Sequence, residues 1–500
     1  MKNSTRLSKR RGLTLVELMV ASTLGLILVI GVLAAFRQIT HSVTKGRATV
    51  QISGQLRNIT NLMRADFQGI TVKAIPNTSA GAGMGYFEII EGIDNDFVIT
   101  PPNTLPAAVD NLSGDTDDVV MFTSRRLNNP FSGRIQGGLL GSTRNFEIIE
   151  SPNAEVIYWL EPRNTEFLRD GLDNNGDGAI DEAAESQLGI LTHNGMPLAT
   201  LRRRALLIRP DFNGPQGVLM QPDGTPYPAS SAAFFLNLND ISIRINPNGT
   251  ISANSLSDLT MRQNRVAHLP TGIINNNTDP NFPYPFTHAR LPFQSGLAMG
   301  EDVIMDQVIG FDMRVFDPQA KALTAPTGDT ALTPADPGYE SAFRAGSRVV
   351  GLGAYVDLGY AFPYTLTNNS ATSVTQYQSL STFSWLPDPR SQLRTATLPG
   401  MLVATNQRYF QFGNYRTYDT WTIEYERDGL NQNVALNALI DEGQNGLDDN
   451  ATGGVDDTQE SETAPPYPSP LRGFQVIVRA FQNSQQQMRQ FTVSHDFTPE

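Results

Sequence analysis

The chain of 500 residues contains no cysteine, so neither a disulfide framework nor a thiolate metal site can form. Its five histidines are scattered and lack the spacing of a zinc site. No G-x-S-x-G or Walker-type loop occurs, and we expect no enzymatic activity. Cations are also scarce, because 37 lysines and arginines face 50 acidic residues. The net charge of −13 argues against nucleic-acid binding.

The composition is that of a folded protein. Hydrophobic residues make up 40% of the chain and charged residues 17%, which is enough to bury a core and excludes a disordered chain. Length alone suggests two or three domains, although large β-rich domains depart from that expectation. The acidic excess favours a soluble surface that attracts divalent cations.

The most apolar segment lies near the N-terminus. A basic segment, residues 1–12, carries five cations and precedes an almost wholly apolar run from Leu13 to Phe36. At about 1.5 Å per residue, a helix over this run crosses a hydrocarbon core about 30 Å thick. The cations predict that residues 1–12 are cytoplasmic and that the chain after about residue 37 is not. The single acid Glu17 would cost on the order of 2.5–3.5 kcal/mol in a membrane, so it should have an oppositely charged partner.

The junction of these two segments resembles the processing site of type IV prepilins, which include the pseudopilins of type II secretion. The resemblance lies in six residues, Gly12-Leu13-Thr14-Leu15-Val16-Glu17. It implies cleavage after Gly12 by a prepilin peptidase and N-methylation of the new terminus at Leu13. It also implies that Glu17 pairs with the terminal amine of a neighbouring pilin in a filament, which agrees with the tolerance of a buried acid beside an opposite charge.

The apolar run could also belong to an ordinary secretory signal or to a plain signal anchor. A secretory signal would end in a small-residue cleavage site, but Phe36-Arg37-Gln38 follows the run. A plain anchor has no need of Gly12 or Glu17. We therefore expect a single-pass protein of the inner (cytoplasmic) membrane, with its C-terminal part in the periplasm and in a filament after assembly.

A helical pattern continues beyond the apolar run. An apolar stripe with steps of three and four residues predicts an amphipathic helix, with polar residues including Asp66 on its other face. We expect one long helix over residues 13–72, ending before Pro76, between a cleaved leader (1–12) and a head (73–500). The stripe comprises Ile52, Leu56, Ile59, Met63, Phe67 and Ile70.

From residue 86 onward the patterns predict strands and no further amphipathic helix. The expected fold class is α+β: a long N-terminal helix packed on a mainly antiparallel β head with long insertions. The block order resembles the J-type minor pilins of type II secretion or the W-type ones of type IV pili, and the last two strands should form a hairpin. The expected strands are 86–91, 96–100, 118–125, 145–150, 154–161, 198–209, 232–246, 303–316, 348–358, 420–426, 473–481 and 487–496.

Three smaller features of the sequence also need an interpretation. The run Arg202-Arg203-Arg204 could contact an anionic partner, but an exposed edge strand protected by charge is the commoner case. The glycine-rich segment 81–85 favours a linker over a phosphate-binding loop, because it does not follow a strand. Asp117 and Asp118 are expected to be turn residues at a strand entrance.

Two acidic loops, near 170–185 and 428–460, repeat a calcium-loop pattern. In the first, oxygen-bearing side chains stand at positions 1, 3, 5 and 9, and Gly178 stands where such a loop turns. The closing glutamate is absent, since Ala184 occupies position 12. The alternative is an ordinary solvated turn without a metal. The candidate ligands are Asp173, Asn175, Asp177 and Asp181, and in the poorer second copy Asp448, Asn450 and Asp456.

The sequence therefore predicts a non-catalytic minor pilin or pseudopilin of a type II secretion pseudopilus or type IV pilus. Its partners would be prepilin peptidase, other pilins and the inner membrane, with calcium as the one candidate cofactor. A calcium-dependent adhesin head displayed on a pilus tip is the alternative function. An enzyme carried on a pilin stalk is the third.

Overall fold

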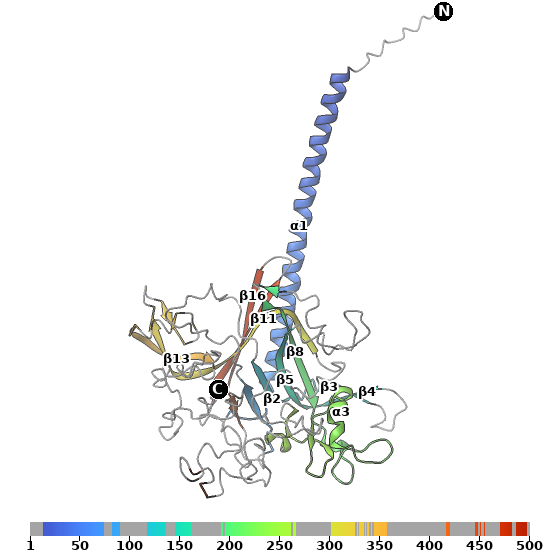
Figure 1. The fold of residues 1–500 in the computed structure, drawn as a ribbon, viewed down its shortest axis with the longest axis vertical. Helices are drawn as coiled ribbons and strands as arrows, with labels where there is room; N and C mark the ends of the chain where they lie inside the picture. Colours follow the sequence, from blue (N-terminus) through green and yellow to red (C-terminus); the bar gives the residue numbers. More distant parts are fainter. Residues whose placement is uncertain are drawn as a thin grey trace, which may run out of the picture. The chain divides into compact units, whose positions relative to one another are not determined.

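A computed structural model describes the larger part of the chain. The described residues are 14–74, 83–90, 118–136, 146–162, 192–193, 196–261, 264–266, 302–325, 345–357, 417–420, 446–448, 471–482 and 487–497, with scattered positions in 328–342 and at 451 and 455. The chain divides into two compact units, residues 1–59 and 60–500. The long apolar helix and the antiparallel head with insertions confirm the predicted α+β class (Figure 1).

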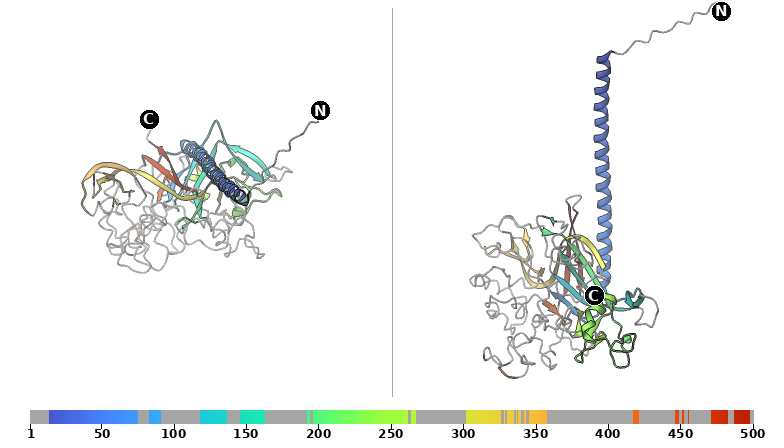
Figure 2. Two further views of the ribbon diagram at one scale, coloured as in Figure 1. Left: turned by 90° about the horizontal axis from the view of Figure 1, so that it is seen from above. Right: turned by 45° about the vertical axis from the view of Figure 1, so that its right-hand side comes forward.

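Helix α1 (Leu15–Gln68) is unbroken over 54 residues (Figure 2). Its last turns belong to the second unit, where Met63 and Phe67 are buried as the apolar stripe predicts. The helix ends four residues before the predicted boundary. At Gly69 the backbone meets the sheet so closely that a Cβ atom would lie 2.3 Å from Ser124 Oγ. The Gly69 carbonyl accepts a 2.7 Å hydrogen bond from the Arg125 amide, which replaces the helical pattern with strand pairing.

The second unit is built on one ten-stranded antiparallel sheet. Its order is β14-β1-β2-β5-β8-β11-β15-β16, and β12 and β13 also pair with β11. The predicted closing hairpin is confirmed by ten paired positions between β15 and β16. The strands are β1 (Phe87–Ile90), β2 (Val119–Arg125), β5 (Asn153–Pro162), β8 (Ala199–Leu207), β11 (Asp302–Thr324), β12 (Ala331–Leu332), β13 (Val349–Asp357), β14 (Thr417–Asp419), β15 (Gly473–Gln482) and β16 (Gln487–Asp496).

The sheet curves around the end of α1. The ring of Phe67 lies 5.5 Å from that of Phe122 on β2 and 4.9 Å from that of Phe474 on β15. Phe87 on β1 also lies 5.1 Å from Phe474, although four strands separate β1 from β15 in the sheet order. Such contacts require strong curvature, since neighbouring strands are about 4.8 Å apart. The concave face therefore encloses the aromatic end of the helix.

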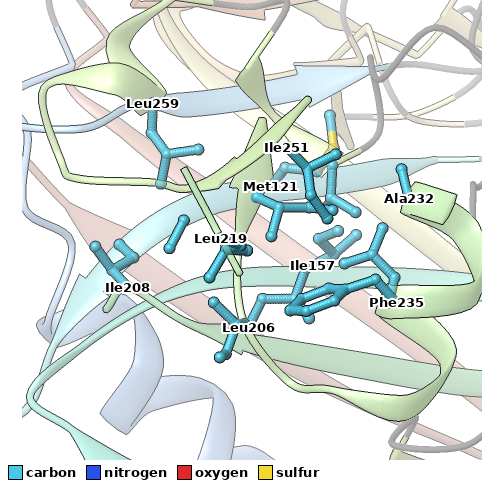
Figure 3. Close-up of a cluster of buried hydrophobic side chains, with 14 of the residues drawn as sticks. Met121, Ile157, Leu206, Ile208, Leu219, Ala232, Phe235, Ile251 and Leu259 are labelled. Carbon is cyan, nitrogen blue, oxygen red and sulfur yellow. The ribbon is translucent and has the colours of Figure 1, made fainter. Parts of the chain in front are cut away.

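Residues 208–266 cover the opposite face of β2, β5 and β8. Met121, Ile157 and Leu206 point from the strands into a buried apolar cluster with Phe235 and Ile251 of the covering segment (Figure 3). The segment contains η4 (Pro210–Phe212), η5 (Ala229–Ser231), α3 (Ala232–Leu238), β9 (Ile243–Ile245), β10 (Ile251–Ala253) and η6 (Asp258–Thr260). Beside it lies the hairpin β3 (Phe131–Gln136) and β4 (Phe146–Ser151), and a separate short pair is β6 (Thr192–His193) with β7 (Met196–Pro197).

The strand predicted over residues 232–246 is wrong in its first half, as is the expectation of no later helix. Helix α3 occupies 232–238, because Ala232, Phe235 and Leu236 recur at helical spacing and are buried while Phe234 is 65% exposed. Strand β3 was not predicted. Strand β14 ends at Asp419, directly before the strand expected over 420–426. Residues 421–426 and the strand expected at 96–100 lie outside the described residues.

Candidate functional site

Helix α1 begins with two side chains that cap each other. The Thr14 hydroxyl accepts a 3.2 Å hydrogen bond from the Glu17 amide, and Glu17 Oε2 accepts a 2.9 Å bond from the Thr14 amide. The Thr14 hydroxyl also donates to the same carboxylate oxygen at 3.0 Å. This is a capping box, which satisfies backbone donors that the first turn leaves unpaired. The spacing Thr-x-x-Glu is a sequence signal for such a cap, and it was not among the features used to predict the helix.

The capping box leaves part of the Glu17 carboxylate available. Both hydrogen bonds that the Glu17 carboxylate accepts from Thr14 fall on Oε2, whereas Oε1 accepts no hydrogen bond from any described residue. No lysine, arginine or histidine of the described residues pairs with Glu17. Its hydrogen-bond partner among the described residues is therefore the neutral Thr14.

The segment after the cap is suited to a membrane. The first 26 residues of the helix, Leu15–Thr40, are long enough and apolar enough to cross a bilayer; an 18-residue window within them has a mean hydropathy of 2.5, and none of that window is buried. Its hydroxyl groups are satisfied internally, because Ser22 and Thr23 donate to the Met19 carbonyl at 2.9 Å. That leaves an almost wholly apolar surface, which requires lipid or other apolar helices around it.

The structure does not describe most of the remaining predicted site residues. Gly12, Leu13 and the candidate calcium ligands Asp173, Asn175, Asp177, Asp181, Asn450 and Asp456 lie outside the described residues. Asp448 is described and exposed, in a bend after Gly446. Within the described ranges no three metal-binding side chains gather. The calcium loops stay a prediction.

A buried charge cluster fixes the end of α1 to the concave face of the sheet. Asp66, expected on the polar face of the helix, is instead wholly buried. Its carboxylate accepts hydrogen bonds from Arg126 Nη2 at 2.5 Å, Arg203 Nε at 2.9 Å and the Tyr158 hydroxyl at 2.5 Å. Burial raises the pKa of the Tyr158 phenol, so it remains a donor. Asp302 adds a second, more exposed acid at 2.8 Å from Arg203 Nη1.

The interpretation of Arg202-Arg203-Arg204 as an exposed, charge-protected edge is wrong. Strand β8 is central, between β5 and β11, and all three arginines are at most 6% exposed. Because side chains alternate along a strand, Arg203 faces α1 while its neighbours face the other way. Arg204 pairs with Asp240 at 2.9 Å and donates to the Leu236 carbonyl at 2.7 Å, and Arg202 pairs with Glu161. Arg203 therefore contacts α1 on one face of the sheet, and Arg204 contacts the covering segment on the other.

Asp118 is likewise buried rather than a turn residue, and its carboxylate accepts a 2.7 Å hydrogen bond from the Met313 amide of β11. A second buried cluster centres on Arg265, whose Nη1 lies 2.7 Å from Glu88 and 2.8 Å from Asp419. Its guanidinium also stacks over the Tyr86 ring at 4.0 Å. These groups hold β1 and β14 to the covering segment, and they are buried structural contacts.

Comparison with known proteins agrees with the N-terminal geometry. A family model described as the prokaryotic N-terminal methylation motif matches residues 7–33. The match includes Thr14, Glu17 and the first half of the apolar span, so this chain carries a prepilin-type N-terminus. No match was found among curated proteins or solved structures.

Proposed function

We propose that this protein is a minor pilin or minor pseudopilin, a non-catalytic structural subunit of a type II secretion pseudopilus or a type IV pilus. The observation that carries the proposal is the methylation motif joined to a capped helix whose first part is almost wholly apolar. The antiparallel head with its long insertions supports a low-copy subunit, because many copies of so large a head would crowd a filament. The layout of the head supports a J-type or W-type position.

Processing would remove the basic leader. Prepilin peptidase would hydrolyse the amide bond between Gly12 and Leu13, and the new amine at Leu13 would then be methylated and stay cationic. Glu17 would become the fifth residue of the mature chain. The apolar helix would hold the subunit in the inner membrane, with the head in the periplasm, until assembly.

Assembly would depend on the oxygen that the capping box does not use. A carboxylate among apolar helices is strongly disfavoured unless an opposite charge lies within about 4–6 Å. Glu17 Oε1 has no hydrogen-bond donor among the described residues, so the terminal amine of a neighbouring pilin can occupy that side. Only a neighbour in the correct axial register would bring the amine there, and the pairing would therefore set the register.

The test uses two variants of Glu17 and one of Gly12 in cells that carry the assembly machinery. Glu17→Gln keeps the capping hydrogen bonds but removes the charge, whereas Glu17→Ala removes both. We expect both variants to be processed, measured by the mass of the N-terminal peptide, and both to fail to enter filaments. Gly12→Val should retain the leader. A mature chain that starts at Met1, or normal assembly of Glu17→Gln, would contradict the proposal.

We propose further that the acidic loops near 170–185 and 428–460 bind calcium and order these insertions. Alternating oxygen side chains around a glycine turn support this. A calcium-dependent adhesin function for the head would depend on the same loops.

A further inference from the structure

Strand β16 forms one edge of the ten-stranded sheet. It pairs with β15 at ten consecutive positions without a register shift, and in the described part of the chain no strand pairs with its other side. Met488, Gln490 and Ser494 on this strand are exposed. A regular strand of this length presents a row of backbone donors and acceptors to its surroundings.

The register determines which backbone groups point outward. The Phe497 amide donates a 2.8 Å hydrogen bond to the Arg472 carbonyl, which makes this a hydrogen-bonded pair of the antiparallel ladder. Hydrogen-bonded pairs recur every second residue, so the odd-numbered residues of β16 bond to β15. The amide and carbonyl groups of Met488, Gln490, Thr492 and Ser494 therefore point away from the sheet.

The other edges of the sheet have features that discourage pairing, and β16 does not. Strand β14 has only three residues, and the β11–β13 pairing contains two register irregularities. Short edges and bulges are common protections against strand addition, together with lysine and proline. The central residues 490–494 of β16 contain no charge, no proline and no irregularity.

We propose that the β16 edge binds an extended strand of another subunit in the same filament. The inference rests on the proposed function, because it names a contact of that assembly. An extended strand is the structure that satisfies a row of alternating backbone groups. The ligand is thus a polypeptide segment in β conformation rather than a helix or a small molecule.

The side chains of β16 define the chemistry of that strand. On the face toward α1, Val493 is buried and Phe491 half-buried, so the incoming residues beside them should be apolar. On the opposite face, Gln490 and Thr492 favour polar neighbours. Arg489 is exposed and has no ion-pair partner among the described residues, so an acidic residue should lie opposite it. The expected partner segment alternates apolar and polar residues and carries one acid.

The experiment uses the full-length protein in detergent and a defined probe. The probe is a fluorescein-labelled ten-residue peptide of alternating valine and threonine with one glutamate near its end. Binding is followed by fluorescence anisotropy against wild type, Thr492→Pro and Thr492→Ala. Proline at position 492 removes an outward amide but no bond to β15, whereas alanine keeps that amide.

We expect the peptide to bind wild type and Thr492→Ala equally, and Thr492→Pro at least about tenfold more weakly. Arg489→Glu should weaken binding by about threefold to tenfold, with the difference lost at high salt. A peptide N-methylated at alternate backbone nitrogens should not bind, which keeps the test valid even if Thr492→Pro unfolds. Failure of the peptide to bind wild type, or equal binding to Thr492→Pro and wild type, would overturn the proposal.

A second copy of this chain is the competing occupant, and one variant separates the two. Antiparallel self-pairing centred on Thr492 places this residue opposite the same residue of the second copy. Because the chain has no cysteine, Thr492→Cys introduces a single thiol. A disulfide-linked dimer under mild oxidation would assign the edge to self-association and refute the partner strand. These binding tests do not involve Gly12 or Glu17, so their failure leaves the proposed function standing.

Discussion

Replacing Asp66 with alanine should destabilise the head more than any change at an exposed acid. The carboxylate is wholly buried and accepts hydrogen bonds from Arg126, Arg203 and Tyr158. Its removal leaves cationic and hydroxyl donors without their acceptor in a site that excludes water. The sequence position gives no hint of this, since the residue belongs to a polar helical face in the pattern of α1.

The expected loss follows from the burial of both partners. Removing one member of a buried ion pair costs about 3–5 kcal/mol, because the remaining charge is left uncompensated. Arg203 is 6% exposed and retains one acid, Asp302, whereas Arg126 and the Tyr158 hydroxyl lose the carboxylate to which they donate. We therefore expect a decrease of about 3–5 kcal/mol in the free energy of unfolding for Asp66→Ala.

Asp302→Ala provides the matched control, because it removes another acid from the same arginine. The Asp302 side chain is 57% exposed, and pairs of that kind contribute about 0–1 kcal/mol. Both variants would be compared with wild type by denaturant unfolding in detergent, followed by tryptophan fluorescence, to which the buried Trp159 contributes, and by circular dichroism. Equal effects of the two variants, or a loss below about 1 kcal/mol for Asp66→Ala, would refute the assignment of this cluster as the attachment of the helix end.

Three further predictions concern the head. Phe67→Ala should lower the free energy of unfolding by about 3–5 kcal/mol, because the Phe67 ring fills the space between Phe122 and Phe474. A change in melting temperature no larger than that of an alanine variant at an exposed position would contradict this. Burial lowers the pKa of His495, so the unfolded chain binds its proton more readily and stability should fall as the pH drops below about 6.5. His495→Gln should flatten that dependence, measured as melting temperature at pH 7.5 and 5. Calcium added to the full-length protein should give a heat of binding in isothermal titration and raise the melting temperature, and Asp173→Ala with Asp177→Ala should remove both effects. The absence of both the heat and the rise in melting temperature for wild type would exclude the calcium loops.

Local sequence patterns were enough to predict the functional features near the N-terminus. The apolar run, the charge of the leader and the six residues from Gly12 to Glu17 are contiguous, and a membrane span depends on little beyond length and hydropathy. The alternation in β15 and β16 likewise predicted a hairpin, because its partners are neighbours in the chain. Helix α3 was not predicted, because the local sequence and the tertiary structure disagree there. Its phenylalanines favour a strand, whereas packing in the covering segment favours a helix.

The partners of the charged residues could not be derived from the sequence. Arg203 meets Asp66, 137 positions away, and Arg265 meets Glu88, 177 positions away. A single sequence does not show which carboxylate will face which arginine. The tertiary structure likewise decides which backbone groups of β16 point outward. They follow from the order of strands in the sheet and not from any residue of β16 itself.

The amino-acid order alone was enough to predict a membrane anchor and a processing site in this protein, because hydrophobicity and a short recognition motif act without help from distant residues. Folding decided everything that involves buried charge, the position of the helix end, and which strand is left at an edge. The physical reason is that a charge is stable in a protein interior only beside a partner, and the curved sheet brings those partners together.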